Sequence, residues 1–183
     1  MTDLLITRGA TFSRDGANRL ILTRRWADGP HVCFIGLNPS TADHLVDDPT
    51  VRRWMHFALA FGFGGMVAFN LYRFRSSSPA ECRRWADWEN DGPNWYTRDD
   101  LNHNLSVVAE ATKAAMLTVA CWGAAVWDLD WVDHAVEEIT TGGEPWPHIY
   151  CFGRTESGAP IHPMARGKHR IPDNAQPLLW RAA

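Results

Sequence analysis

The side chains best suited to chemistry on a polar ligand are those of two asparagines and one histidine. Asn38 and Asn70 each follow a run of apolar residues, and His162 stands directly before Pro163. An asparagine amide can orient a water or bind a ligand's polar edge, although it cannot take up a proton. A histidine can donate a hydrogen bond or exchange a proton near neutral pH. We therefore treat Asn38, Asn70 and His162 as candidate functional residues.

The loop Gly36-Leu-Asn-Pro-Ser-Thr-Ala-Asp43 directly follows the apolar run 31–35. In an open α/β sheet, ligands bind where strands end and helix N-termini converge. Pro39 has a fixed φ and favours an extended Asn38, so the amide is presented to a ligand. The other candidate substrate-binding residues of this loop are Gly36, Leu37, Pro39, Ser40 and Thr41. Its two hydroxyl residues could bind a phosphate or cap a helix, and the whole loop could be an ordinary strand-to-helix turn.

The order of apolar runs predicts the fold class. Four runs are typical of buried strands, namely 31–35, 66–71, 116–121 and 148–152, after a hairpin over 9–24. Helices are predicted from Asp48, over 99–114, and from about Val126 to Gly142, whereas 72–101 is predicted to be a long functional loop. Strands that alternate with helices predict a three-layer α/β/α sandwich with a mainly parallel central sheet.

This topology predicts that residues far apart in the sequence meet at one edge of the sheet. Right-handed crossovers bring the C-terminal ends of parallel strands together. Asn38, Asn70, Trp122-Gly123 and His162 all lie at such ends. Each also has a structural alternative: His162-Pro163 could be a capped turn, and Asn70 could satisfy backbone groups of its own loop. Trp122 joins the candidate substrate-binding residues.

Composition limits the classes of protein to which the chain can belong. Its 183 residues, 45% of them hydrophobic and 21% charged, predict one globular domain over 1–183. No apolar run would span a membrane and no signal peptide is visible, so we expect a cytoplasmic protein without a membrane partner. The net charge of −3 argues against an extensive electrostatic binding surface for nucleic acid. Four cysteines without CxxC spacing predict buried thiols, and we expect no metal and no cofactor.

Several motifs together resemble a known family. The loop Gly36–Asp43, Asp48-Pro-Thr-Val-Arg-Arg53, Gly62-Phe-Gly-Gly65 and Asn70-Leu-Tyr-Arg-Phe-Arg75 look like a small bacterial and phage family of unknown function. Gly158-Ala-Pro-Ile-His-Pro163 fits the same family, so the resemblance covers about residues 10–180.

More remotely, the order of motifs resembles the uracil-DNA glycosylase superfamily. That resemblance implies that the loop Gly36–Pro39 holds a catalytic water and that Asn70 pairs with the edge of a base. It also implies that Trp122-Gly123 and the loop at His162-Pro163 complete the site. The chain departs from the superfamily where Met164-Ala165-Arg166 follows the histidine, in place of the usual minor-groove wedge. We include Arg166 as a candidate substrate-binding residue.

The resemblance implies a glycosylase-like hydrolase that acts on the N-glycosidic bond of a base in a nucleotide or nucleic acid. In such a reaction His162 could donate to a base carbonyl and Asn38 could orient a water. Asp43, Asp47 and Asp48 could be caps and solvated charges, or one of them could be the general base. Two alternatives remain open. The chain could be a binding module for a nucleotide or modified base, or its tryptophan-rich segment 85–95 could dock a protein partner.

Overall fold

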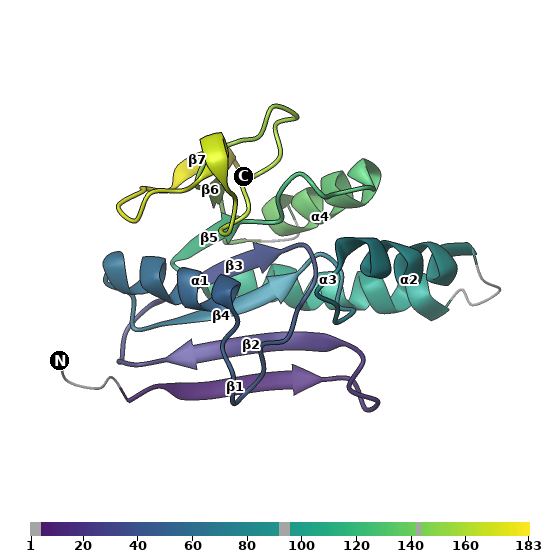
Figure 1. The fold of residues 1–183 in the computed structure, drawn as a ribbon, viewed down its shortest axis with the longest axis horizontal. Helices are drawn as coiled ribbons and strands as arrows, with labels where there is room; N and C mark the ends of the chain where they lie inside the picture. The colour runs from purple at the N-terminus through teal and green to yellow at the C-terminus, as the bar shows by residue number, and fades with distance from the viewer. Residues whose placement is uncertain (1–4, 92–95, 142–143) are drawn as a thin grey trace.

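A seven-stranded sheet forms the centre of the molecule (Figure 1). The structure, a computed structural model, describes residues 5–91, 96–141 and 144–183. Its strands are β1 (Thr7–Phe12), β2 (Arg19–Arg25), β3 (His31–Gly36), β4 (Gly65–Asn70), β5 (Leu117–Ala120), β6 (Ile149–Cys151) and β7 (Leu178–Arg181). Their order across the sheet is β1-β2-β4-β3-β5-β6-β7.

The sheet is mixed, and the prediction of a mainly parallel sheet is wrong in this respect. Parallel pairing joins β3 to β4, β3 to β5 and β5 to β6, whereas β1 with β2, β2 with β4 and β6 with β7 are antiparallel. The N-terminal hairpin adds β1 and β2 to one side, and β7 covers the opposite edge. The four predicted buried strands nevertheless lie side by side as the parallel centre of the sheet.

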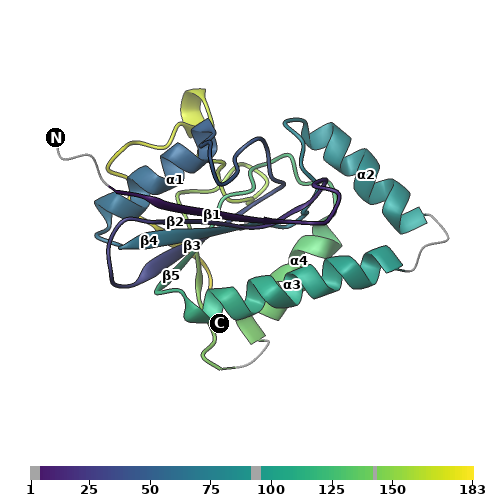
Figure 2. The same cartoon turned by 90° about the horizontal axis from the view of Figure 1, so that it is seen from below.

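Helices cover both faces of the sheet, as the sequence predicts (Figure 2). The helices are α1 (Pro49–Ala60), α2 (Pro79–Asp91), α3 (Tyr96–Ala114) and α4 (Leu129–Thr141), with a short 3₁₀ turn at Gly167–His169. One apolar cluster joins the sheet to α1 through Phe34, Trp54 and Phe57. A second cluster joins the opposite face to α3 and α4 through Ile35, Leu105 and Ile139. Because adjacent strand residues point to opposite faces, Phe34 belongs to the first cluster and Ile35 to the second.

Local sequence explains where α1 begins. The side chain of Asp48 accepts a hydrogen bond of 2.9 Å from Val51 N, which satisfies one of the free amides of the first turn. Pro49 stands at the first helical position, where a missing N–H costs nothing. Val51, Trp54 and Ala58 then bury one stripe of the helix against the sheet. The predicted cap and buried stripe are confirmed.

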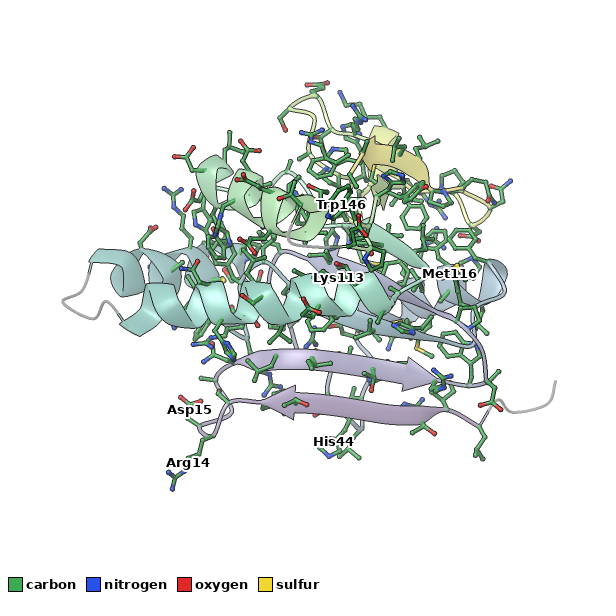
Figure 3. The ribbon with its side chains drawn as sticks, turned by 180° about the vertical axis from the view of Figure 1, so that it is seen from behind. Arg14, Asp15, His44, Lys113, Met116 and Trp146 are labelled. Atoms are coloured by element: carbon green, nitrogen blue, oxygen red, sulfur yellow. The ribbon has the colours of Figure 1, made fainter. Side chains whose placement is uncertain are left out.

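The predicted hairpin is also confirmed, and its turn lies where Asp15 and Gly16 indicate. Ala17 N donates to Asp15 Oδ1 at 3.0 Å, and Gly16 has a φ of 74°, which glycine adopts without strain. Figure 3, which views the molecule from behind, shows Arg14 and Asp15 projecting from the tip of this turn.

Three elements differ from the prediction. The segment 72–101, predicted as a long loop, contains α2 and the start of α3. Ser78 O accepts from Glu81 N and Cys82 N at the start of α2, and Trp85 stacks on Phe74 with ring centroids 5.2 Å apart. Trp85 is therefore partly buried against the core, whereas the side chains of residues 88–95 lie outside the described part of the chain. The strand β7 was not predicted, because only Trp180 of its four residues is buried.

The third difference is the start of α4, which begins at Leu129 and about one turn later than predicted. The side chain of Asp128 accepts from Trp131 N at 2.9 Å and caps the helix there. Residues 122–127 are therefore free to form a loop beside the end of β5.

The predicted burial of the cysteines is confirmed. Cys33, Cys82, Cys121 and Cys151 are buried free thiols. Burial raises the pKa of Cys33 and of Cys82 to about 12, so these thiols stay protonated at neutral pH. They behave as small apolar groups of the core. Within the described residues, no helix is long and apolar enough to cross a membrane.

Candidate functional site

A cavity of about 320 Å³ opens where the parallel strands end. The arrowheads of β3 and β4 point to this edge of the sheet in Figure 1. Its walls come from Gly36, Leu37 and Asn38 after β3, from Asn70 at the end of β4, from Trp122 after β5 and from His162 after β6. Arg19, Asp48 and Trp54 complete the interior, and Ser76, Ser77 and Pro79 add the N-terminus of α2. The predicted meeting of Asn38, Asn70 and His162 is confirmed.

Backbone hydrogen bonds that continue beyond the strands hold these loops together. Leu71 N donates to Gly36 O at 2.9 Å, and Cys121 N donates to Ile35 O at 2.8 Å. Gly123 N donates to Pro160 O at 2.9 Å and so joins the loop after β5 to the loop that carries His162. The side chains of the cavity therefore stand on a rigid, hydrogen-bonded rim and not on independent loops.

Asn38 is held so that its amide oxygen is the free end of the side chain. Asn38 Nδ2 donates to Ser76 O at 2.7 Å and to Pro39 O at 3.2 Å. Its Oδ1 accepts from no group in the part of the chain that the structure describes. Because both amide hydrogens are engaged, Asn38 offers a ligand or a water an acceptor and not a donor.

The amide of Asn70 has the opposite orientation, because its oxygen and not its nitrogen is hydrogen-bonded within the described part of the protein. Its Oδ1 accepts a hydrogen bond of 3.2 Å from Arg19 Nη2, and the residue is 5% exposed. The other end of the amide, Nδ2, lies over Gly36, where an added Cβ would be 2.6 Å away. Arg19 thus fixes the orientation of the amide, and Asn70 presents a donor to the cavity.

The arrangement is possible because Gly36 has no side chain. An added Cβ would also lie 3.3 Å from the ring of Trp54, which stacks on Phe34 with ring centroids 5.5 Å apart. A side chain at position 36 would therefore displace both Asn70 and the aromatic wall of the cavity.

His162 is a neutral donor in this site. Its Nδ1 accepts from Met164 N at 3.1 Å, so the ring proton of the neutral form is on Nε2. Burial lowers the pKa of His162 below its usual value, and the charge of Asp48 opposes the shift in part. The Cβ of His162 lies 3.0 Å from the position that an added Cβ on Gly123 would take. Gly123, with a φ of 79°, allows this close contact.

Asp48 brings a carboxylate into the cavity while it caps α1. It is 8% exposed and uses Oδ1 for the hydrogen bond to Val51 N. Its second oxygen accepts no hydrogen bond from the described residues. Asp48 interacts electrostatically with both Arg19 and His162, since its charge raises the pKa of each against the effect of burial. Among the three aspartates considered from the sequence, Asp48 is the one that lines the cavity.

A family model of proteins of unknown function, DUF1643, matches residues 19–164 of the chain. The chain belongs to the DUF1643 family. The matched residues run from Arg19 to Met164 and so contain every side chain of the cavity named above. Neither the curated proteins nor the solved structures gave a match.

Three predicted substrate-binding residues of this DUF1643 chain do not line the cavity. Pro39 is buried beneath the loop, where its carbonyl accepts from Ser76 N at 2.9 Å. Thr41 is exposed on the outer side of the same loop, and Arg166 is exposed where it precedes the 3₁₀ turn. Gly36, Leu37, Ser40 and Trp122 do line it.

Arg19, Ser76 and Ser77 line the cavity but were not among the candidate site residues predicted from the sequence. Arg19 begins the antiparallel strand β2, and this start lies at the edge where the parallel strands end, since Arg19 N donates to Arg73 O at 2.9 Å just beyond β4. The prediction rested on residues that follow strands, whereas Arg19 precedes one. The serines lie in a segment that was predicted to be a loop, and the sequence did not predict where this loop lies relative to the sheet. The sequence carries no clear signal for Arg19, because its burial is visible only in the structure.

The described residues hold no group of three or more histidine, cysteine, aspartate or glutamate side chains that could bind a metal ion. The cavity instead presents fixed hydrogen-bonding groups of opposite character. Asn70 and His162 supply donors, and Asn38 and Asp48 supply acceptors.

Proposed function

We propose that this protein hydrolyses the N-glycosidic bond between a base and its sugar in a nucleotide or nucleic acid, on a fold similar to that of uracil-DNA glycosylases. One observation carries the proposal. Asn38, Asn70 and His162, which the resemblance assigns to water, base edge and leaving group, surround one cavity of about 320 Å³. That volume lies at the lower end of the range of roughly 300–1,000 Å³ for small-molecule sites. It suits a base with part of its sugar.

Breaking this bond leaves negative charge on the departing base and positive charge on the sugar. Donors that are already oriented toward the base lower the barrier, because they need no reorganisation as the charge grows. The Nε2 proton of His162 is such a donor, whereas the Nδ2 group of Asn70 binds the edge of the base in the ground state. A neutral histidine suits this role, because it donates a hydrogen bond without giving up its proton.

The attacking water needs an orienting group and a proton acceptor. Asn38 Oδ1 can accept a hydrogen bond from the water, since both hydrogens of the same amide are held by backbone carbonyls. Asn38 cannot accept a proton, so we assign that step to the free oxygen of Asp48. The water oxygen then bonds to the anomeric carbon, and the base nitrogen leaves with the electron pair of the broken bond. The proton on Asp48 neutralises the released base.

The experiment is a test of base release. Purified protein is incubated with a panel of nucleosides, nucleotides and single- and double-stranded oligonucleotides, and free base is measured by chromatography. We expect release from at least one member of the panel, a loss of turnover in Asn38→Ala with ligand binding retained, and a drop of roughly 10²-fold in His162→Ala. Thr41→Ala, on the outer side of the same loop, is the matched control and should keep wild-type activity.

The pattern of variants separates the proposal from its alternative. Asn70→Ala should weaken binding and relax the choice of base, because Asn70 contacts the ground-state base. Binding of a nucleoside by the wild type without any free base would contradict hydrolysis and favour a binding module. Equal activity of wild type and Asn38→Ala would contradict the assigned role of the loop.

A further inference from the structure

The cavity contains a buried cation that forms no ion pair with the described residues. Arg19 is 3% exposed, and its side chain donates to Ala42 O at 3.0 Å and to Asn70 Oδ1 at 3.2 Å. Both acceptors are neutral. No carboxylate of the described residues lies within ion-pair distance of Arg19, although Asp48 is near enough to raise its pKa.

A second buried arginine shows what a structural role looks like in the same molecule. Arg24 is 1% exposed and forms an ion pair of 2.6 Å with Asp47. It also donates to Asp43 O at 2.6 Å and thereby ties the loop before α1 to β2. Arg24 is paired with a carboxylate and does not line the cavity, whereas Arg19 lines the cavity without such a partner.

The charge of Arg19 persists in spite of its burial. Loss of hydration lowers the pKa of Arg19 to about 10, which still leaves the guanidinium protonated at neutral pH. A buried charge without an ion-pair partner is unfavourable for stability, and such groups gather at functional sites. The natural partner is negative charge that arrives with a ligand or develops during the reaction.

We propose that Arg19 is the main electrostatic partner of the departing base, whose carbonyl oxygen faces Arg19 and Asn70. This inference rests on the proposed function and adds to it a catalytic residue. The floor of the cavity presents a guanidinium and an amide N–H, and both are donors. Bases that turn an amino group toward this floor would meet donor against donor and bind poorly.

The test uses leaving groups of graded acidity. Base release is measured for 2′-deoxyuridine, 5-fluoro-2′-deoxyuridine and 5-nitro-2′-deoxyuridine, placed in the single-stranded oligonucleotide, with wild type, Arg19→Gln and Asn70→Ala. We expect Arg19→Gln to slow release of uracil by roughly 10²- to 10³-fold and to slow release of the more acidic bases much less. Asn70→Ala should lower all three rates by a similar factor, because it removes a contact but keeps the charge.

A second measurement keeps the inference separate from hydrolysis. The free bases uracil and 5-nitrouracil are titrated onto wild type, Arg19→Gln and Arg19→Lys, at a pH where 5-nitrouracil is ionised and uracil is neutral. Wild type and Arg19→Lys should favour the anion, and Arg19→Gln should lose that preference. Thermal unfolding of each variant shows whether it is folded. If Arg19→Gln does not fold, the comparison is made between wild type and Arg19→Lys.

Each outcome is decisive for one of the two claims. No base release by the wild type, with a preference for the anion that requires the charge at position 19, would overturn hydrolysis and keep the anion site. Base release with equal slowing of all three leaving groups in Arg19→Gln would keep hydrolysis and overturn the role of Arg19. Equal binding of neutral and ionised base by the wild type would overturn it as well.

Discussion

The contact between Gly36 and Asn70 gives the sharpest prediction about the architecture of the site. In Gly36→Ala, the new Cβ would lie 2.6 Å from Asn70 Nδ2 and 3.3 Å from the ring of Trp54. The first distance is well inside van der Waals contact, so the amide of Asn70 must turn or move. Because Arg19 Nη2 donates to Oδ1 of that amide at 3.2 Å, the movement breaks the bond that orients it.

The size of the effect follows from what is lost. A hydrogen bond to a charged group contributes about 1.5–3 kcal/mol, and its loss here also leaves a buried guanidinium with one acceptor fewer. We therefore expect Gly36→Ala to lower the free energy of unfolding by about 2 kcal/mol in urea titrations. Ligand affinity should fall as well, since Nδ2 no longer points into the cavity.

A double-mutant cycle with Asn70→Ala isolates this contact. In the Asn70→Ala background the methyl group added at position 36 meets no amide, so Gly36→Ala should cost about 2 kcal/mol less than in the wild type. Additive losses in the cycle, or a Gly36→Ala protein as stable as the wild type, would refute the stated geometry of Gly36, Asn70 and Arg19.

Two further predictions concern the acid–base groups. Asp48→Asn should keep the start of α1, because asparagine caps helices as well as aspartate, and should lower turnover by about 10²- to 10⁴-fold. The control is Asp43→Asn, at a residue whose side chain holds a turn outside the cavity. Unchanged turnover in Asp48→Asn would contradict the assignment of Asp48 as the proton acceptor. Because the pKa of His162 is lower in the folded state than in the unfolded state, its contribution to stability is complete above about pH 6.5 and is lost as the pH falls. Between about pH 7.5 and pH 5 the wild type should therefore lose more stability than His162→Gln, and parallel stability curves would contradict the burial of a neutral ring.

Much of the fold was predictable because its central elements have strong local signals. The parallel strands are apolar runs with both faces covered, and α1 combines a cap, a proline and a buried stripe. The edges of the sheet are harder to predict. The strand β7 buries Trp180 alone, so neither periodicity nor composition marks it clearly. The direction of β2 against β4 depends on tertiary pairing, which local pattern does not encode.

The site was predictable in its strand-end residues and not in the residues that orient them. Asn38, Asn70 and His162 follow strands, so topology alone brings them to one edge. Arg19 lies at the same edge but at the start of the antiparallel strand β2, so it precedes its strand and does not follow it. Its contact with Asn70 decides whether that amide presents a donor or an acceptor. The carboxylate of Asp48 was visible as a helix cap, but its free oxygen in the cavity depends on how the loop before α1 folds against β2.

Hydrolysis at the cavity is the central claim, and isotope labelling in a single turnover tests it most directly. Excess wild-type protein is mixed with a single-stranded oligonucleotide that contains one 2′-deoxyuridine, in water enriched in ¹⁸O, and the products are analysed by mass spectrometry. The account predicts free base together with one ¹⁸O atom at the anomeric carbon of the remaining sugar, and neither product with Asn38→Ala. An oligonucleotide that stays intact while bound to the wild type, or a free base released equally by wild type and Asn38→Ala, would contradict it.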